Sequence, residues 1–478
     1  MWIEASAKVI GKGYGKRIAD GISCLLPATE RRQTASRMLP FTPPAIGDSA
    51  LATSSTEQSR GFFRIKSAEW PALLLSFAYF FCVLGSYYVM RPVREQLVAA
   101  AGSTSLPSFY LATFLVTLAL TPIYGALVAR FPRKRFVPIV YAFFILCLIA
   151  FIPFFEIQGQ LNPKLLGGVF FVWVSVFNLF VVAVFWSFMA DIFTVDQSHR
   201  LFSVISIGGG LGAIGGSLLA GSLFGHIGIA KLLAVSAGLL GCSIACIAGL
   251  VVWSRRNPIE KGVDRNEVVI GGGMLAGARQ VFASPFLRSM ALLLLLGDGV
   301  GTVLYALQAD YAKAHFPDGI ARTEFFAHID LAINVTQTVL QLTLTPWVLT
   351  RRGPVIAVIT ADAVKVAGLL LLVLVGNPAL IAVALVATRS FAYGMEKPSS
   401  DSLYTRVDRE ERYKAKGFID TAVWRLGDFT IALAMNGLRG LGMTTTGFAC
   451  LATFAAGGAC WTAWRLRGTR ELATQAGR

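Results

Sequence analysis

The chain has 478 residues, of which 55% are hydrophobic and only 15% are charged. This composition excludes an ordinary soluble domain and is typical of a polytopic membrane protein. The formal net charge is +16, but the basic residues fall in alternate loops rather than on one face, so the charge indicates membrane topology and not nucleic-acid binding.

Residues 1–65 differ from the rest of the chain. They are rich in Gly, Ser and Arg and hold no apolar run long enough for a signal peptide. We expect a disordered basic tail or a mis-assigned start, with Met38 as a later start. A transit peptide is the alternative, because Arg and Ser are abundant, although acidic residues are scattered through the segment.

Apolar windows long enough to cross a bilayer as helices follow one another from residue 68 onward. They are 68–101, 106–129, 136–155, 165–190, 203–225, 231–253, 286–308, 324–350, 354–375, 378–397, 418–438 and 444–464. The alternating pattern of a membrane β-barrel is missing. The sequence therefore predicts an all-α polytopic membrane protein with twelve transmembrane helices.

Basic residues follow the even-numbered windows, as Arg351 and Arg352 do after the eighth. By the positive-inside rule both termini are predicted to be cytoplasmic. The longest internal polar stretch divides the windows six and six, which is the layout of the major facilitator architecture. The predicted parts are an N-terminal half at 66–253, a cytoplasmic linker at 254–285, a C-terminal half at 286–466 and a tail at 467–478.

The turn after the second window reads GALVARFPRKR at residues 125–135. It resembles the facilitator loop motif G-x-L-x-D-R-x-G-R-K-R, with Ala129 at the acidic position and Pro132 at the second glycine. The resemblance implies that Arg130 and Arg133 take part in a cytoplasmic gate. Ordinary positive-inside charge is the alternative.

The fifth window contains GGGLGAIGG at residues 208–216, which matches G-x-G-x-x-G. A dinucleotide site needs that motif between a strand and a helix of a soluble unit, whereas this match lies in an apolar window. Gly208, Gly212 and Gly216 recur at four-residue spacing, so we expect close helix packing or a hinge.

Neither a cofactor nor a metal site is expected. The seven cysteines lie mostly inside apolar windows without a CxxC spacing, and the chain has four histidines. No nucleophile, base and orienting group stand at a recognisable spacing, so we do not expect an enzyme.

Charged residues inside the apolar windows are the most informative feature, because a charge in lipid costs several kcal/mol and usually faces a cavity or a partner. In a facilitator fold the first, seventh, eighth, tenth and eleventh helices line the central cavity. The predicted substrate-binding residues on these helices are Arg91, Arg94, Glu95, Asp298, Asp330, Asn334, Arg389, Glu396 and Lys397. Inter-half gating is the alternative role for them.

The stretch SYYVMRPVRE at residues 86–95 ends the first apolar run. As a helix it places Arg91, Arg94 and Glu95 on one face. Pro92 predicts a kink or local unwinding that frees backbone groups towards a cavity. A cluster snorkelling at the outer surface is the alternative.

The ninth window carries Asp362 and Lys365 one turn apart. This helix is peripheral in the facilitator architecture, so we interpret the two residues as a structural pair that neutralises itself.

The sign of the intramembrane charge favours an anionic solute. Four of the predicted substrate-binding residues are basic, which is more positive charge than a cation site would tolerate: Arg91, Arg94, Arg389 and Lys397. Arginine also holds carboxylate or phosphate in two-point geometry. The acidic residues are then either partners of these bases or proton carriers.

Two short patches resemble the ATP/ADP translocases of plastids and intracellular bacteria. YVMRPVREQLV at 88–98 is similar to their first-helix signature, and the segment 396–428 is similar to the one between their tenth and eleventh helices. The resemblance implies that Arg91 and Arg94 contact phosphate and that Lys416 lies near the cytoplasmic mouth. The predicted gating residues are Lys416, Asp420, Arg425, Asp428, Arg130 and Arg133, although a solvated helix is the alternative for the loop 405–420.

These patterns together predict a secondary active transporter that works by alternating access in a bacterial inner membrane. Its expected partners are a small organic anion, such as a nucleotide or phosphorylated metabolite, the lipid bilayer and protons, with no nucleic acid. A proton-coupled exporter of drug-like solutes and a non-transporting membrane scaffold or sensor are the alternatives.

Overall fold

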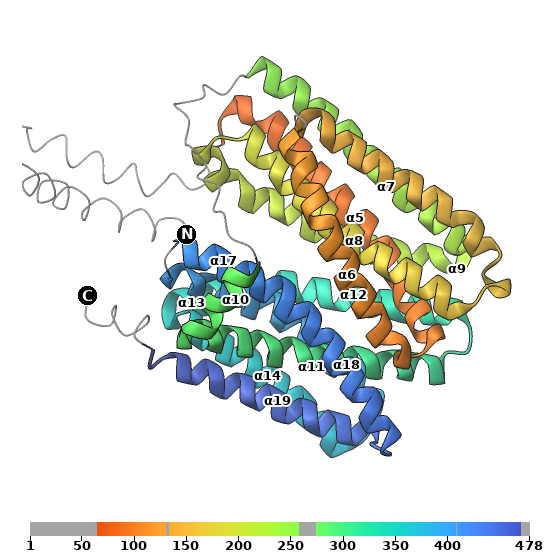
Figure 1. Cartoon of the computed structure of the whole chain (residues 1–478). Helices are drawn as coiled ribbons and strands as arrows, with labels where there is room; N and C mark the ends of the chain where they lie inside the picture. The colour runs from red at the N-terminus through yellow and green to blue at the C-terminus, as the bar shows by residue number, and fades with distance from the viewer. Residues whose placement is uncertain (1–64, 131–132, 258–273, 408, 470–478) are drawn as a thin grey trace, which may run out of the picture. The chain divides into compact units, whose positions relative to one another are not determined.

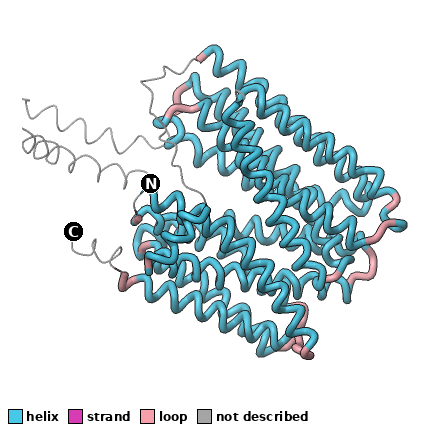
Figure 2. The backbone as a smooth tube through the Cα atoms, viewed as in Figure 1, coloured by secondary structure: helices cyan, strands magenta, loops and turns pink. Residues whose placement is uncertain are grey.

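The computed structural model describes residues 65–130, 133–257, 274–407 and 409–469. The predicted N-terminal tail up to residue 64 and the last nine residues therefore lie outside the described part. Within that part the regular elements are all helical, with no strand (Figure 2). The chain divides into a small unit, whose described residues are 65–70 and 194–203, and a large unit of residues 71–193 and 204–478.

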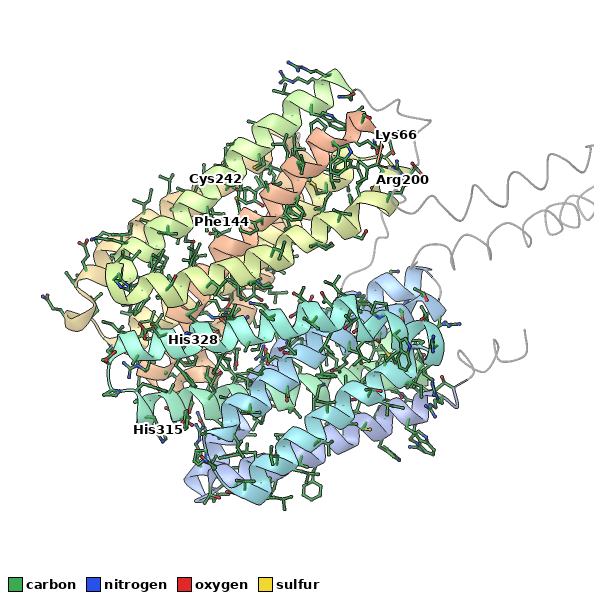
Figure 3. The ribbon with its side chains drawn as sticks, turned by 180° about the vertical axis from the view of Figure 1, so that it is seen from behind. Lys66, Phe144, Arg200, Cys242, His315 and His328 are labelled. Atoms are coloured by element: carbon green, nitrogen blue, oxygen red, sulfur yellow. The ribbon has the colours of Figure 1, made fainter. Side chains whose placement is uncertain are left out.

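The small unit is held by a buried carboxylate. Glu69, which is 3% exposed, pairs with Arg200 at 3.0 Å and accepts a hydrogen bond from Gln197 Nε2 at 3.1 Å. The Lys66 amide donates to the other side of the same carboxylate at 3.0 Å, and Figure 3 labels Lys66 and Arg200. Arg200 also pairs with Asp196 one helical turn earlier. A carboxylate that accepts several such bonds fixes the start of the first long helix to the start of the fifth.

The large unit contains the long helices of both predicted halves. Figure 1 shows α5 to α9 gathered into one bundle, here the first bundle, and α10 to α19 gathered into the second bundle. The first bundle consists of α5 (Trp70–Ala101), α6 (Leu106–Arg130), α7 (Arg133–Glu156), α8 (Pro163–Ile192) and α9 (Val195–Arg256). The second consists of α10 (Met274–Ala283), α11 (Pro285–His315), α12 (Gly319–Leu342), α13 (Leu344–Arg352), α14 (Pro354–Val375), α15 (Leu380–Phe391), α16 (Lys397–Leu403), α17 (Arg409–Phe418), α18 (Trp424–Gly440) and α19 (Thr445–Leu466).

Short irregular helices connect or interrupt the long ones. They are the 3-10 helices Ser67–Glu69, Ser103–Ser105, Gln158–Gln160 and Tyr404–Arg406 and the π turns Ala392–Glu396 and Ile419–Val423. The π turns join α15 to α16 and α17 to α18 without a loop. Wide turns of this kind inside helices are frequent at functional sites.

Within the described part of the chain, seven helical segments are long and apolar enough to cross a membrane, by length and composition. They are Ser67–Ala101, Ser103–Ile123, Phe136–Glu156, Pro163–Ile192, Arg200–Arg256, Pro285–His315 and Pro354–Val375. The fifth of these covers two predicted windows, which meet at Gly228, where φ is +74°. Glycine adopts this left-handed backbone without a steric penalty, so the break between the windows lies where the chain can bend. The eighth, tenth, eleventh and twelfth windows also form helices, α12, α15, α18 and α19, and twelve crossings stay a prediction.

One local expectation was wrong. The eighth window is not one helix, because α12 ends at Leu342 and α13 begins at Leu344. The predicted linker 254–285 includes helix at both ends, since α9 continues to Arg256 and Met274–Ala283 forms α10, and its role as a linker stays a prediction. Of the two effects expected of Pro92, local unwinding is not seen, because α5 stays helical from Trp70 to Ala101.

The glycine run packs α9 against α5, as predicted. A Cβ atom added to Gly208, Gly212 or Gly216 would lie 2.6, 2.2 or 2.5 Å from a carbonyl oxygen of α5, at Phe77, Phe81 and Gly85 respectively. No real Cβ contact is that short, so only glycine allows the two backbones this separation. Each of these glycines on α9 therefore faces a successive turn of α5, and the G-x-G-x-x-G match is a surface for helix packing.

A shared apolar core joins the two bundles. It includes Val98 from α5, Leu304 from α11, Ile333 from α12 and Ala432 from α18, all at most 3% exposed. Its members come from α5, α6, α8, α11, α12, α14, α15, α18 and α19. Val98 and Ile333 of this core lie one helical turn from Arg94 on α5 and from Asp330 on α12.

Candidate functional site

The charged residues of SYYVMRPVRE are buried in the large unit. Arg94 Nη2 lies 2.5 Å from Glu95 Oε1, and Arg91 Nε lies 3.5 Å from the same oxygen. The three side chains are 11%, 12% and 5% exposed for Arg91, Arg94 and Glu95. The alternative of a snorkelling surface cluster was therefore wrong, because the interior already offers these charges partners.

Residues of the second bundle complete this group. Tyr305 on α11 donates a hydrogen bond to Glu95 Oε2, and Arg91 Nε lies 3.4 Å from Asp330 Oδ1 on α12. We call Arg91, Arg94, Glu95, Tyr305 and Asp330 the Arg91 cluster. It joins α5 of the first bundle to α11 and α12 of the second, so any solute that enters it contacts both.

Aromatic rings hold the guanidinium groups. The Cζ atoms of Arg91 and Arg94 lie 5.4 and 5.1 Å from the ring centroids of Tyr88 and Phe171. The Arg389 guanidinium lies 5.9 Å from the Tyr305 ring centroid. Its Nη1 also donates to the Tyr393 hydroxyl at 3.0 Å. Arg389 thus extends the Arg91 cluster towards α15.

Some donors in the cluster lack a hydrogen bond. The Nε atoms of Arg91 and Arg94 are buried and make no hydrogen bond to the described residues, although Arg91 Nε lies within ion-pair distance of Glu95 and Asp330. A buried donor without a partner costs about 1–3 kcal/mol, and more when it carries charge. Within the cluster two guanidinium groups balance two carboxylates. Arg389 beside it adds a third guanidinium group, and Asp298 lines the same small cavity as Arg389.

A small cavity lies beside Arg389, and its volume is about 60 Å³. Asp298, Arg389, Glu396 and Lys397, four of the predicted binding residues, line it together with Tyr393. The other lining residues are Leu294, Gly297, Gly301, Thr388, Ala392, Ser400 and Trp424. Sites for small organic ligands are usually about 300–1,000 Å³, so in this conformation the cavity has room for water-sized groups.

Glu396 connects this cavity to the buried pair on α14. Lys365 Nζ donates to Asp362 Oδ1 at 3.0 Å and to Glu396 Oε2. The expected pairing of Asp362 with Lys365 is confirmed, but the pair is not isolated. Glu396 joins the pair as a third charged residue. It ends the π turn Ala392–Glu396 and was predicted as a binding residue.

Lys397 belongs mainly to a different network. Its Nζ lies 3.5 Å from Asp401 and 3.3 Å from Asp420, and Asp401 also pairs with Lys416 at 2.7 Å. Lys416 lies 5.5 Å from the Tyr404 ring centroid. Burial, together with the charges of Asp420 and Asp401, raises the pKa of the Tyr404 phenol. The predicted gating residues Lys416 and Asp420 are thus brought together, within the second bundle.

The other predicted gating residues lie elsewhere. Arg425 stacks on its neighbour Trp424, with Cζ 5.7 Å from the ring centroid. Asp428 is 7% exposed and accepts a hydrogen bond from Thr302 Oγ1 at 2.6 Å, so it joins α18 to α11 inside the second bundle. Arg130 ends α6 and Arg133 begins α7, and their side chains lie outside the described part of the structure.

Asn334 reaches the first bundle from α12. Its Nδ2 donates to Ser217 Oγ on α9 at 3.3 Å, and both side chains are buried. Gln341, seven residues further along α12, donates to the Tyr393 carbonyl at 3.1 Å. These polar residues of α12 therefore contact α9 in one direction and the π turn Ala392–Glu396 in the other.

Tyr305 and Tyr393 were missed by the sequence reasoning. Tyr305 lies seven residues after Asp298, two helical turns along, and Tyr393 lies four residues after Arg389. Residues at those spacings share a face of a helix, so a search for polar-tipped aromatics on the charged faces would have found both.

Polar contacts also join the bundles at one end. Arg439 at the end of α18 donates to Ser103 Oγ at 2.6 Å and pairs with Asp310 of α11. Asn436 Nδ2 donates to the Thr104 carbonyl at 2.8 Å. These residues adjoin the loops after the first, seventh and eleventh predicted windows, the side predicted to be external. The two bundles are thus held together at that end.

A larger groove of about 1050 Å³ lies along α6, α7 and α8. Its lining includes Leu120, Phe143, Leu165 and Trp173 and is almost wholly apolar, with Lys164 as its charged residue. Such a surface suits lipid better than a charged solute, so the candidate site is the Arg91 cluster and not this groove.

No protein-family model matches the chain. Two curated relatives, both from Arabidopsis thaliana, are "ADP,ATP carrier protein 1, chloroplastic" and "ADP,ATP carrier protein 2, chloroplastic". The first is 22% identical over 444 residues, which is 80% of this chain and 70% of the relative. The second is 21% identical over 411 residues, 73% of this chain and 66% of the relative.

Solved transporters share the architecture. The bacterial homologue of the iron transporter ferroportin in an inward-facing state aligns with a TM-score of 0.59 at 15% identity, covering 85% of this chain and 100% of that one. The nucleoside transporter NupG aligns with a TM-score of 0.58 at 13% identity, covering 84% of this chain and 98% of that one. The transporter PepTSo aligns with a TM-score of 0.54 at 14% identity, covering 84% of this chain and 98% of that one. The chain thus shares the fold of these solved transporters. This agrees with the all-α polytopic, facilitator-like fold predicted from the sequence, while the twelve crossings and the cytoplasmic termini stay predictions.

Proposed function

We propose that this protein is a secondary transporter that works by alternating access and moves a small organic anion. The observation that carries the proposal is the Arg91 cluster. It is buried, it joins the two bundles, and the buried Nε of Arg94 makes no hydrogen bond to the described residues, while Arg91 Nε has only ion-pair contacts with Glu95 and Asp330. An anion that enters between the bundles would accept hydrogen bonds from these guanidinium groups.

A nucleotide is the first candidate for the cargo. Guanidinium groups bind phosphate in two-point geometry, and Arg91, Arg94 and Arg389 supply three of them. Tyr88 and Tyr393 offer rings beside these arginines, and aromatic faces stack on nucleobases. The names of the two plant relatives, both ADP,ATP carriers, support the same class.

The ion pair between Arg91 and Asp330 offers a way to couple binding to movement. It crosses from the first bundle to the second, so a phosphate that takes Arg91 leaves Asp330 without its partner. A ligand shifts a conformational equilibrium only through such a difference between states. We take residues 66–253 and 286–466 as the two moving halves, with the segment containing α10 between them.

We further place the protein in a bacterial plasma membrane, on the resemblance of its first-helix motif and the multi-pass character of the chain. The names of the plant relatives place those proteins in chloroplasts.

The test is nucleotide exchange in liposomes. Purified protein should exchange external ATP for internal ADP, and Arg94→Ala and Arg389→Ala should abolish the exchange while the proteins stay folded. Arg256→Ala, at the exposed end of α9, is the matched control and should exchange normally. If exchange survives both arginine substitutions, an anion site formed by these arginines is excluded. Tight ATP binding without any flux would instead favour the scaffold or sensor.

A further inference from the structure

Asp362, Lys365 and Glu396 form a buried triad between α14 and the end of the π turn on α15. Asp362 and Lys365 are 0% and 1% exposed, and the Glu396 side chain is 12% exposed. Lys365 donates to both carboxylates. Two acidic groups thus share one base in a region that the fold removes from water.

The charges of the triad do not balance when every group is ionised. One ammonium and two carboxylates carry a net charge of minus one, and an uncompensated buried charge is strongly unfavourable. Asp362 Oδ2 is buried and has no hydrogen-bond partner among the described residues. A proton on that carboxyl group makes the triad neutral, and nothing in the contacts around Asp362 Oδ2 supplies another positive charge.

We propose that the triad binds one exchangeable proton, carried by Asp362, and couples a proton gradient to the movement of the cargo. This inference rests on the transport function proposed above. The triad is neutral when the proton is bound and carries one negative charge when it is released. The interior of the second bundle therefore has to accommodate a negative charge in one state and no net charge in the other. Binding of the proton thus shifts the conformational equilibrium.

Among the described residues, the neighbouring elements supply no other counter-charge to Asp362. On α11 the nearby charged residue is Asp298, which lines the cavity beside Glu396. On α19 the facing titratable group is Cys460. On α15, Arg389 is engaged by Tyr393, and on α16, Lys397 and Asp401 belong to the network with Asp420 and Lys416. The basic residues of α13, Arg351 and Arg352, are exposed. Lys365 and Glu396 are thus the charged groups in contact with Asp362.

Glu396 provides the route to the cargo. It lines the small cavity beside Arg389 while it holds Lys365, so a proton can pass between the cavity and the buried carboxyl group. Gly297 on α11 lies directly over this link, because an added Cβ would lie 2.9 Å from Glu396 Oε1 and 3.3 Å from Lys365 Nζ. Movement of α11 relative to α14 would therefore open or close the route.

The Arg91 cluster differs from the triad in its charges. Glu95 pairs with both Arg91 and Arg94, and Asp330 pairs with Arg91, so two guanidinium groups balance two carboxylates without an added proton. Arg389 lies beside this balanced group and adds positive charge for the anion, whereas the triad needs a proton to become neutral.

Infrared spectroscopy tests the proton without transport. Difference spectra of the detergent-solubilised full chain between acid and alkaline solution should show the band of a protonated carboxyl group. The band should be lost in Asp362→Asn and kept in Glu156→Gln, which removes an exposed carboxylate at the end of α7. A band that persists in Asp362→Asn, or that disappears in Asp298→Asn instead, overturns the proposal.

Flux in liposomes tests the coupling with ATP as the probe. An imposed pH gradient should drive ATP accumulation by the wild type, and Asp362→Asn should lose that accumulation while ATP/ADP exchange continues. Loss of exchange together with accumulation would show a general defect and overturn the coupling role. If Asp362→Asn does not fold, Glu396→Gln replaces it in the test. In that variant Asp362 and Lys365 form a neutral ion pair, so Asp362 needs no proton, and the same infrared band should be lost. If the wild type moves no nucleotide at all, the cargo is wrong, and the infrared result still decides the proton site.

Discussion

Tyr305 on α11 donates its hydroxyl hydrogen to Glu95 on α5, and its ring lies beside the Arg389 guanidinium. One side chain thus connects the first bundle to the second and links the two parts of the proposed anion site. Glu95 holds Arg91 and Arg94 through its other oxygen. The orientation of all three arginines therefore depends on this tyrosine.

Tyr305→Phe should weaken nucleotide binding without unfolding the protein. The ring stays beside Arg389, but Glu95 Oε2 loses its donor, which costs about 1–3 kcal/mol for a buried polar group. A thermal-shift titration with ATP should show a smaller stabilisation than the wild type gives, since ligand stabilisation follows affinity. Tyr311→Phe, further along the same helix, is the control. Equal ATP-dependent shifts for Tyr305→Phe and the wild type would contradict the linking role.

Much of the fold was predictable, because bilayer crossing imposes a length and a hydropathy that the sequence shows directly. The ninth window, 354–375, matches α14 residue for residue, and the spacing of Gly212 and its neighbours predicted close helix packing, although not that the partner is α5. The interruption near Thr343 and the helix α10 were not predicted, since short helices beside a span depend on tertiary contacts rather than on periodicity.

The candidate site was predictable by residue type but not by partnership. Arg91, Arg94 and Glu95 share a face because of their spacing, whereas the pairing of Arg91 with Asp330 needs the packing of α5 on α12. Lys365 shows the same limit. Its spacing revealed Asp362, but Glu396 lies 31 residues away in sequence, and no local pattern connects them.

Lys365→Met should be the most destabilising single change in the triad. It leaves two buried carboxylates without a counter-charge, and removing one partner of a buried ion pair typically costs about 3–5 kcal/mol. The melting temperature of the detergent-solubilised protein should fall well below that of the wild type. Adding Asp362→Asn and Glu396→Gln to the same chain should restore most of it. A triple variant as unstable as Lys365→Met would mean that packing, and not charge balance, determines the effect.

Gly212→Ala should separate α9 from α5. The added methyl group would lie 2.2 Å from the Phe81 carbonyl oxygen, and overpacking of this kind typically costs about 1–3 kcal/mol. Gly238→Ala on the same helix is the matched control, because nothing lies within 4 Å of a Cβ at that position. It should leave the melting temperature unchanged or raise it, since alanine favours helix over glycine. Equal melting temperatures for the two variants would contradict close packing at the glycine run.

A cross-link at the joined end of the two bundles should stop transport. Asn436 and Thr104 are within hydrogen-bond reach across the interface, so Thr104→Cys combined with Asn436→Cys, in a chain whose seven cysteines are replaced by serine or alanine, should form a disulfide on mild oxidation. Alternating access requires this end to open. ATP/ADP exchange should therefore be lost on oxidation and return on reduction, while each single-cysteine variant exchanges under both conditions. Exchange that continues through the cross-linked protein would show that these ends need not separate, and the rocking of the two halves would have to be abandoned.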